Sequence, residues 1–209
     1  MDFLNAIILI SNFVIVPSIT YGSQLALGAI GVTLIYGVLR FANFAYGDLM
    51  AFGTMCVILF TWLFQSWGIN FGLLPTALLA LPFGIILTIC VSLFFDKTVF
   101  EYYRNKKSSP VTFIVVSLGI MFVLNAIVRI IIGPNDIFFM DGSRFLISAV
   151  NFKESTGLSE GLTIKSTQII TIITTSITCF ILFNFLNKTK TGKSMRAYSN
   201  NEDLALLSG

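Results

Sequence analysis

Residues Gly22–Gly53 read GSQLALGAIGVTLIYGVLRFANFAYGDLMAFG, and this stretch decides the fold because two apolar runs flank a short polar interruption. In the first run, small residues recur at helical spacing and form one narrow stripe: Gly22, Ala26, Ala29 and Thr33. In lipid, such a stripe lets the backbones of two helices approach closely. The sequence therefore predicts that this stripe packs a membrane helix against a neighbour.

The polar interruption, Asn43–Asp48, places an amide, a glycine and a carboxylate between the two apolar runs. At membrane depth, polar and irregular backbone is tolerated only against protein or water. Two interpretations stay open: a cytoplasmic turn between two spans, which composition alone favours, or a polar wall of a path through the membrane. The depth of Asp48 in the membrane distinguishes the two interpretations. At the boundary its carboxylate is solvated by water, whereas deeper in the membrane it needs a partner within the protein.

The composition of the whole chain predicts an integral membrane protein. Of its 209 residues, 56% are hydrophobic and 11% are charged, with a mean hydropathy of +0.88, whereas soluble domains carry about 25% charged residues. A soluble fold would expose large apolar patches to water. We therefore expect an all-α polytopic bundle of transmembrane helices.

Several function classes are excluded by what the sequence lacks. The net charge of +3 is too small and too dispersed to indicate a nucleic-acid partner. The three cysteines lie inside apolar runs without CxxC spacing, and the chain contains no histidine, so we expect neither a metal site nor a cofactor. No nucleophile with a positioned base is evident, so the sequence does not predict an enzyme.

Six apolar runs predict about six spans: 3–19, 24–39, 49–67, 73–95, 112–132 and 168–187. The later runs approach or exceed the roughly 20 residues needed to cross the hydrocarbon layer. The first two are short, and they form either two spans or an interfacial helix followed by one span. The sequence thus predicts a transmembrane domain over 1–187 and a cytoplasmic segment over 188–209.

Two basic clusters orient the chain, one at 97–107 and one at 188–196. Lysine and arginine favour the cytoplasmic side, and two crossings separate the clusters, so both lie inside together. The segment 133–167 is then external, and strands at 144–152 and 162–165 predict a small hairpin there. With six spans, the N-terminus is expected on the cytoplasmic side.

Two polar residues within the fifth run, Asn125 and Arg129, lie four positions apart on one helical face. We expect Asn125 to make an interhelical hydrogen bond rather than to contact a solute. Because Arg129 is near the outer end of the run, we expect its side chain to reach toward the interface.

The end of the chain, Gly192–Gly209, predicts two short helices, the second capped by Asn200 or Asn201. A short amphipathic helix next to the membrane either binds a soluble partner or lies on lipid, and both interpretations stay open.

Two of these segments resemble the permease subunits of branched-chain amino acid ABC importers. The first match comprises Gly31–Val38, Asn43–Ala45, Gly47 and Asp48, with Tyr46 where the family usually has histidine. The second match is the family's cytoplasmic loop that docks into ATPase subunits, and it suggests these coupling residues: Gly192, Met195, Arg196, Ala197, Asp203 and Leu207.

The resemblance implies a permease of a binding-protein-dependent importer in a bacterial inner membrane, carrying branched-chain or related amino acids by alternating access. Its implied partners are a second homologous permease, two ATP-binding subunits, a periplasmic substrate-binding protein and membrane lipid. The implied lining of the path is Asn43, Phe44, Tyr46, Gly47 and Asp48. A stand-alone channel or secondary carrier for a small polar solute such as urea or an amide remains the alternative.

The family continues with further spans beyond the position of Gly209. The resemblance therefore implies a fragment, one half of a split subunit or a shortened chain. Half of a bundle would leave packing surfaces unburied, so we expect it to depend on a partner.

Overall fold

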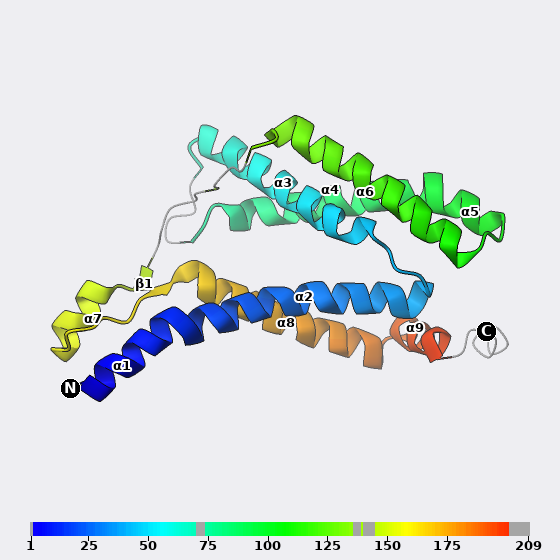
Figure 1. The fold of residues 1–209 in the computed structure, drawn as a ribbon. Helices are drawn as coiled ribbons and strands as arrows, with labels where there is room; N and C mark the ends of the chain where they lie inside the picture. Colours follow the sequence, from blue (N-terminus) through cyan, green and yellow to red (C-terminus); the bar gives the residue numbers. More distant parts are fainter. Residues whose placement is uncertain (1, 70–73, 136–138, 140–144, 201–209) are drawn as a thin grey trace. The chain divides into compact units, whose positions relative to one another are not determined.

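The computed structural model describes residues 2–69, 74–135, 139 and 145–200, and these residues form an all-α helical protein with one small sheet (Figure 1). Among these described residues, five helical runs are long and apolar enough to cross a membrane. The predicted class, a polytopic transmembrane helical bundle, is therefore confirmed. The elements, in chain order, are α1 (Asp2–Ile10), η1 (Ser11–Ile15), α2 (Val16–Leu39), α3 (Ala45–Ser66), α4 (Ala77–Phe95), η2 (Asp96–Phe100), α5 (Glu101–Asn105), α6 (Pro110–Ile132), β1 (Phe145–Ile147), α7 (Ala149–Thr156), β2 (Ile164–Lys165), α8 (Ser166–Lys188) and α9 (Lys190–Asn200).

The count of about six spans becomes five because the first two apolar runs form one continuous helical run, Phe3–Leu39. The hydroxyls between them do not interrupt the helix, since Thr20 and Ser23 donate to the carbonyls of Val16 and Ile19 in their own helix. Figure 1 shows α1, η1 and α2 as one bent helix. Its 37 residues measure about 55 Å, well beyond a hydrocarbon layer of roughly 30 Å.

The bend has a local cause in the wide π turn η1, which comes just before Pro17. Proline lacks a backbone N–H, and its ring collides with the carbonyl four residues earlier in a regular α-helix. The π turn, closed by the Val16 N–H bonding to the Ser11 carbonyl, widens the helix at that place. The chain thereby passes the proline without ending the helix.

The chain divides into two compact units, Met1–Val38 with Ser143–Gly209 (unit 1) and Leu39–Gly142 (unit 2). In unit 1 the start of the long helix lies against the 160–163 segment. The Asn12 amide donates to the Gly161 carbonyl at 2.8 Å and accepts from the Thr163 N–H at 2.9 Å. At the other end of the same helix, a Cβ on Gly37 would come within 3.3 Å of Ser199 in α9.

The predicted cytoplasmic N-terminus assumed two crossings before Arg40, and the side of the membrane on which the N-terminus lies stays a prediction. Within unit 1, the first helical run begins at the 160–163 end, and α9 lies at the opposite end.

The predicted hairpin is present, but its first strand is shorter than expected. β1 and β2 pair antiparallel, with Phe145 opposite Lys165. Residues 149–152, predicted as strand, instead begin α7, because the Ser148 hydroxyl accepts from the Asn151 N–H and caps that helix. Gly157, with φ of +68°, ends α7 in the left-handed conformation.

Unit 2 is held together by α3, which packs against α4 and α6. Between α3 and α4, glycines allow close approach: an added Cβ at Gly84 would collide with Val57 Cγ2 and come within 3.2 Å of the Val57 nitrogen. Between α3 and α6, the buried residues form one apolar core: Ala45, Phe52, Met55, Cys56, Ile120 and Leu124.

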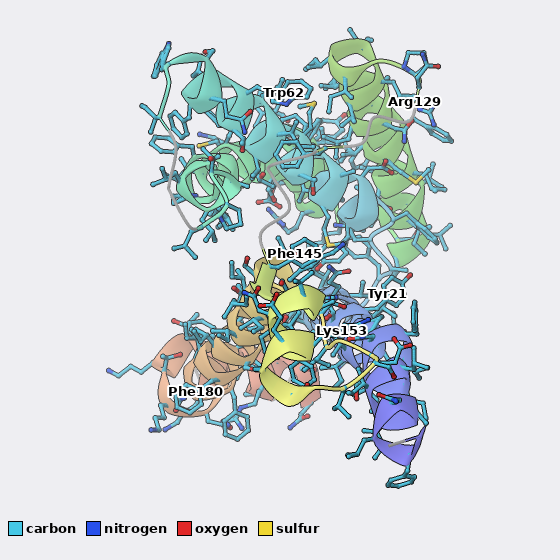
Figure 2. The ribbon with its side chains drawn as sticks, turned by 90° about the vertical axis from the view of Figure 1, so that its left-hand side faces the viewer. Tyr21, Trp62, Arg129, Phe145, Lys153 and Phe180 are labelled. Carbon is cyan, nitrogen blue, oxygen red and sulfur yellow. The ribbon has the colours of Figure 1, made fainter. Side chains whose placement is uncertain are left out.

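The long described helices carry many exposed apolar side chains. Phe13, Phe122 and Phe180 are 76%, 67% and 70% exposed, and Figure 2 shows Phe180 projecting away from α8. In water such a surface would promote aggregation, whereas lipid tails or another membrane subunit satisfy it. The chain is a multi-pass membrane protein.

The close approach of α3 and α4 predicts that two glycine-to-alanine substitutions in unit 2 differ in their effect on stability. Gly84→Ala should lower the free energy of unfolding by about 1–3 kcal/mol, because the β-branched Val57 cannot move aside without shifting the backbone. The matched control, Gly119→Ala on α6, meets open space and should be neutral or slightly stabilising. Thermal unfolding of the purified protein in detergent measures both, and equal melting temperatures would contradict the packing.

Candidate functional site

The polar interruption forms the start of α3 and is anchored in the protein. The Phe44 N–H donates to the Ser117 hydroxyl at 3.2 Å, and the Ala45 N–H donates to the Asn43 side-chain carbonyl at 3.1 Å. The first N–H groups of a helix have no partners within it, so these acceptors satisfy them. Ser117 itself is fully buried and donates to the Ile114 carbonyl.

The start of α3 lies beside the interior of α6 rather than beside the first residue of α6. The Phe41 ring stacks on Phe113 at 5.2 Å, and Phe44 meets Ser117, which is seven positions or about 10 Å after Pro110. Figure 1 shows the first turn of α3 displaced in the same way from that of α6. The interruption therefore lies beside the interior of α6, a helix of 23 residues, rather than beside its first turn.

Asp48 has a polar partner on the neighbouring helix α6. Its Oδ1 accepts from the Asn125 amide nitrogen at 2.9 Å, and the Asn125 carbonyl accepts from Arg129 Nε at 2.8 Å. The expected interhelical bond of Asn125 is therefore present, between α6 and α3. Arg129, labelled in Figure 2, directs its Nε back along α6 toward Asn125.

The other residues predicted to line a path lie in the same turn with different exposure. Asn43 and Tyr46 are half-buried, Phe44 is 50% exposed, and Gly47 is exposed with open space beside it. Asn43 has a structural task, since it caps α3. Phe44 and Gly47 are thus the members of the group with free surface.

The stripe predicted for helix packing lies on α2 and is exposed along its whole length: Gly22, Ala26, Ala29 and Thr33. A Cβ at Gly22 would meet nothing within 4 Å. No described residue covers this stripe, and its packing role stays a prediction. The close helix contact in the described residues uses Gly53 and Gly84 instead.

The basic end of unit 1 is a rigid elbow between α8 and α9. Gly192 is buried, and an added Cβ would collide with the Phe185 carbonyl and come within 2.6 Å of Leu186 Cα. The Thr189 hydroxyl accepts from the Gly192 N–H at 3.0 Å, and Arg196 donates to the Asn187 side-chain carbonyl at 2.7 Å. A displacement of α9 would therefore carry the end of α8 with it.

The residues predicted to bind a soluble partner are in part described. Met195, Arg196 and Ala197 are exposed on α9, whereas Gly192 lies inside the elbow. Helix α9 begins at Lys190 rather than at Gly192. The second predicted helix, with Asp203 and Leu207, lies outside the described residues.

Sequence reasoning assigned no structural role to Ser117, Gly84 or Asn187. The only local signals were a hydroxyl or glycine inside an apolar run and an asparagine at the end of one. Such residues are common in membrane helices for several reasons, so their partners had to come from the structure.

Comparisons with known proteins show the family to which the chain belongs. Residues 14–209 match the family model described as branched-chain amino acid transport system, permease component. The chain is 26% identical over 197 residues to the high-affinity branched-chain amino acid transport system permease protein LivH of Escherichia coli K12, covering 91% of this chain and 59% of that protein. It is 24% identical over 196 residues to the corresponding protein BraD of Pseudomonas aeruginosa, covering 92% and 59%.

The chain therefore spans about three fifths of the length of these curated relatives. No solved structure matches it significantly.

Removing the Ser117 hydroxyl should weaken the start of α3. Ser117→Ala leaves the part-buried Phe44 N–H without its acceptor, which should cost about 1 kcal/mol of stability. Ser176→Ala is the matched control, because the Ser176 hydroxyl is exposed and bonds within its own helix. Hydrogen exchange should accelerate at residues 44–48 in the first variant alone, and unchanged protection there would argue against the cap.

Proposed function

The chain belongs to the branched-chain amino acid transport permease family, and on that basis we propose that it is a transmembrane subunit of a binding-protein-dependent ABC importer for branched-chain or related amino acids. The match over residues 14–209 is the observation that carries this proposal. The subunit performs no chemistry itself and provides part of the path for the solute.

The residues proposed to line the path are Asn43, Phe44, Tyr46, Gly47 and Asp48. Their hydrogen bonds to Ser117 and Asn125 in the interior of α6 support this role, since polar groups beside the middle of a spanning helix lie against protein or a solute path rather than lipid. Transport proceeds by alternating access, in which two packings of the helices expose the path to one side at a time.

The importer needs further subunits: a second homologous permease, two ATP-binding subunits and a periplasmic substrate-binding protein. The exposed apolar surface and the uncovered small-residue stripe on α2 support a permease partner within the membrane. The ATP-binding subunits act on α9 and the residues after it, at Met195, Arg196, Ala197, Asp203 and Leu207. The elbow at Gly192 supports this assignment, because α9 packs closely against the end of α8 there and a displacement of α9 would also move α8.

The protein lies in a bacterial inner membrane with both basic clusters, 97–107 and 188–196, in the cytoplasm. The segment 133–167 is then external. Because the first helical run is single and its start bonds to residues 160–163, the N-terminus is external as well.

A stand-alone channel or secondary carrier for urea or a small amide is the second candidate, favoured by the polar network of Asp48, Asn125 and Arg129 inside the helices. The two candidates differ in whether transport requires ATP.

Reconstitution tests the proposed function. The full-length permease, assembled in liposomes with the second permease, ATP-binding subunits and binding protein encoded beside it, should take up leucine only when ATP is present. Uptake by the permease without ATP-binding subunits would instead support the channel or carrier, and absence of leucine uptake in the full assembly would remove the proposal.

The same assembly tests the coupling residues. Met195→Glu and Arg196→Glu should each reduce co-purification of the ATP-binding subunits by roughly tenfold, because each places an unpaired carboxylate in the interface. Lys153→Glu, which matches the charge change of Arg196→Glu on the exposed helix α7, serves as control and should have no effect. Undiminished binding in both α9 variants would refute the coupling role.

Cysteine tagging tests the orientation, in a background with the native cysteines replaced by alanine. A membrane-impermeant maleimide added outside should label cysteines at Phe3 and Lys153 in intact cells. Cysteines at Lys106 and Lys193 should react only after the membrane is opened. Labelling of Lys106 and Lys193 from opposite sides would overturn the orientation, and a protected Phe3 position would return the N-terminus to the cytoplasm.

A further inference from the structure

Two opposite charges in unit 2 are joined through a neutral amide. The Asn125 amide nitrogen donates to Asp48 at 2.9 Å, while its carbonyl oxygen accepts from Arg129 Nε at 2.8 Å. Asp48 and Arg129 make no direct ion pair, although both are among the described residues. The amide thus faces the carboxylate with its donor and the guanidinium with its acceptor.

A direct ion pair would be the simpler arrangement in an apolar layer, where unpaired charges are expensive. Here the Asn125 amide separates the two charged groups. Each of them keeps hydrogen-bonding groups that the amide does not use. Within the part of the chain that the structure describes, the second carboxylate oxygen of Asp48 and the terminal guanidinium nitrogens of Arg129 have no hydrogen-bond partner. The network is therefore satisfied only in part and can accept a further ligand.

The orientation of the amide defines the chemistry of that ligand. An α-amino acid carries an ammonium group, which donates, and a carboxylate, which accepts, on one carbon atom. The distance between these groups is comparable with the width of one amide. The ammonium can therefore replace the Asn125 donor at Asp48, and the carboxylate can replace the Asn125 acceptor at Arg129.

Charge separates this ligand from neutral amides. Urea and carboxamides offer the same donor and acceptor pattern as Asn125 itself, so they gain little by displacing it. A zwitterion forms charge-assisted hydrogen bonds on both sides, which are roughly twice as strong as neutral ones, and arginine binds a carboxylate with two parallel bonds.

We propose that Asp48 and Arg129 bind the ammonium and carboxylate groups of a zwitterionic solute, and that the Asn125 amide occupies their place while the site is empty. The proposal rests on the proposed function, since it assumes that the chain carries solute past α3 and α6. It assigns part of the charge selection to the membrane subunit, in addition to any selection by the binding protein.

Competition binding tests the proposal on the full permease complex without its binding protein, with labelled leucine as the probe. The competitors are 4-methylpentanoate, which lacks the ammonium, 3-methylbutylamine, which lacks the carboxylate, and the neutral 4-methylpentanamide. None should compete well with leucine in the unmodified complex. Asp48→Asn should raise the affinity for 4-methylpentanoate relative to that for leucine by about tenfold or more. Arg129→Gln should raise the relative affinity for 3-methylbutylamine by the same amount.

A second measurement addresses Asn125 and does not depend on those variants. In Asn125→Leu the empty site loses the group that joins its charges, so leucine should raise the melting temperature of this variant more than that of the unmodified complex. Asn184→Leu is the matched control, because the Asn184 amide donates to the Phe180 carbonyl of its own helix. Its leucine-dependent shift should equal that of the unmodified complex.

Three results would overturn the proposal: no leucine binding without the binding protein, unchanged competition in both charge variants, or a leucine-dependent shift in Asn125→Leu that does not exceed that of the control. ATP-dependent leucine uptake by the intact assembly distinguishes these failures from a failure of the proposed function. If the binding tests fail but the assembly still takes up leucine, the importer works and its charge selection lies at other residues.

Discussion

The first backbone N–H groups of a helix need acceptors outside that helix, and unit 2 depends on how α3 meets this requirement. Ser117 of α6 accepts the Phe44 N–H, and Asn43 accepts the Ala45 N–H. Without these acceptors the first N–H groups of α3 would need water as their partner. The two capping residues therefore permit a polar turn about 10 Å along α6 and bring Asp48 level with Asn125.

Small residues serve two different surfaces in this protein. In unit 2, Gly53 and Gly84 lie at the contact of α3 with α4, where an added methyl group would come within van der Waals contact distance of the neighbouring helix. On α2 the stripe that begins at Gly22 is exposed. Because no hydrophobic force joins helices in lipid, close packing at small residues is a main source of their association. An uncovered stripe thus fits a chain that spans three fifths of its relatives' length.

The sequence predicted the apolar runs well and the connections between them less well. Within the part of the chain that the structure describes, hydropathy identified each helical run that is long enough to span a membrane, but it divided Phe3–Leu39 in two at Thr20–Ser23. The division was wrong because the hydroxyls of Thr20 and Ser23 bond to carbonyls of their own helix. Similarly, α7 replaced part of a predicted strand because the Ser148 cap outweighed the β-propensity of the residues that follow.

The sequence by itself determined that this protein crosses a membrane as helices, because lipid forces each spanning segment to satisfy its backbone internally, and that constraint acts along the chain. It also determined the family, through motifs at both ends of the chain. Only the tertiary structure decided that Asp48 bonds to Asn125, 77 positions away, and that Gly192 forms a rigid elbow. Those contacts depend on how far one helix is displaced along another and on how closely two backbones approach, and neither quantity is expressed in the periodicity of a single segment.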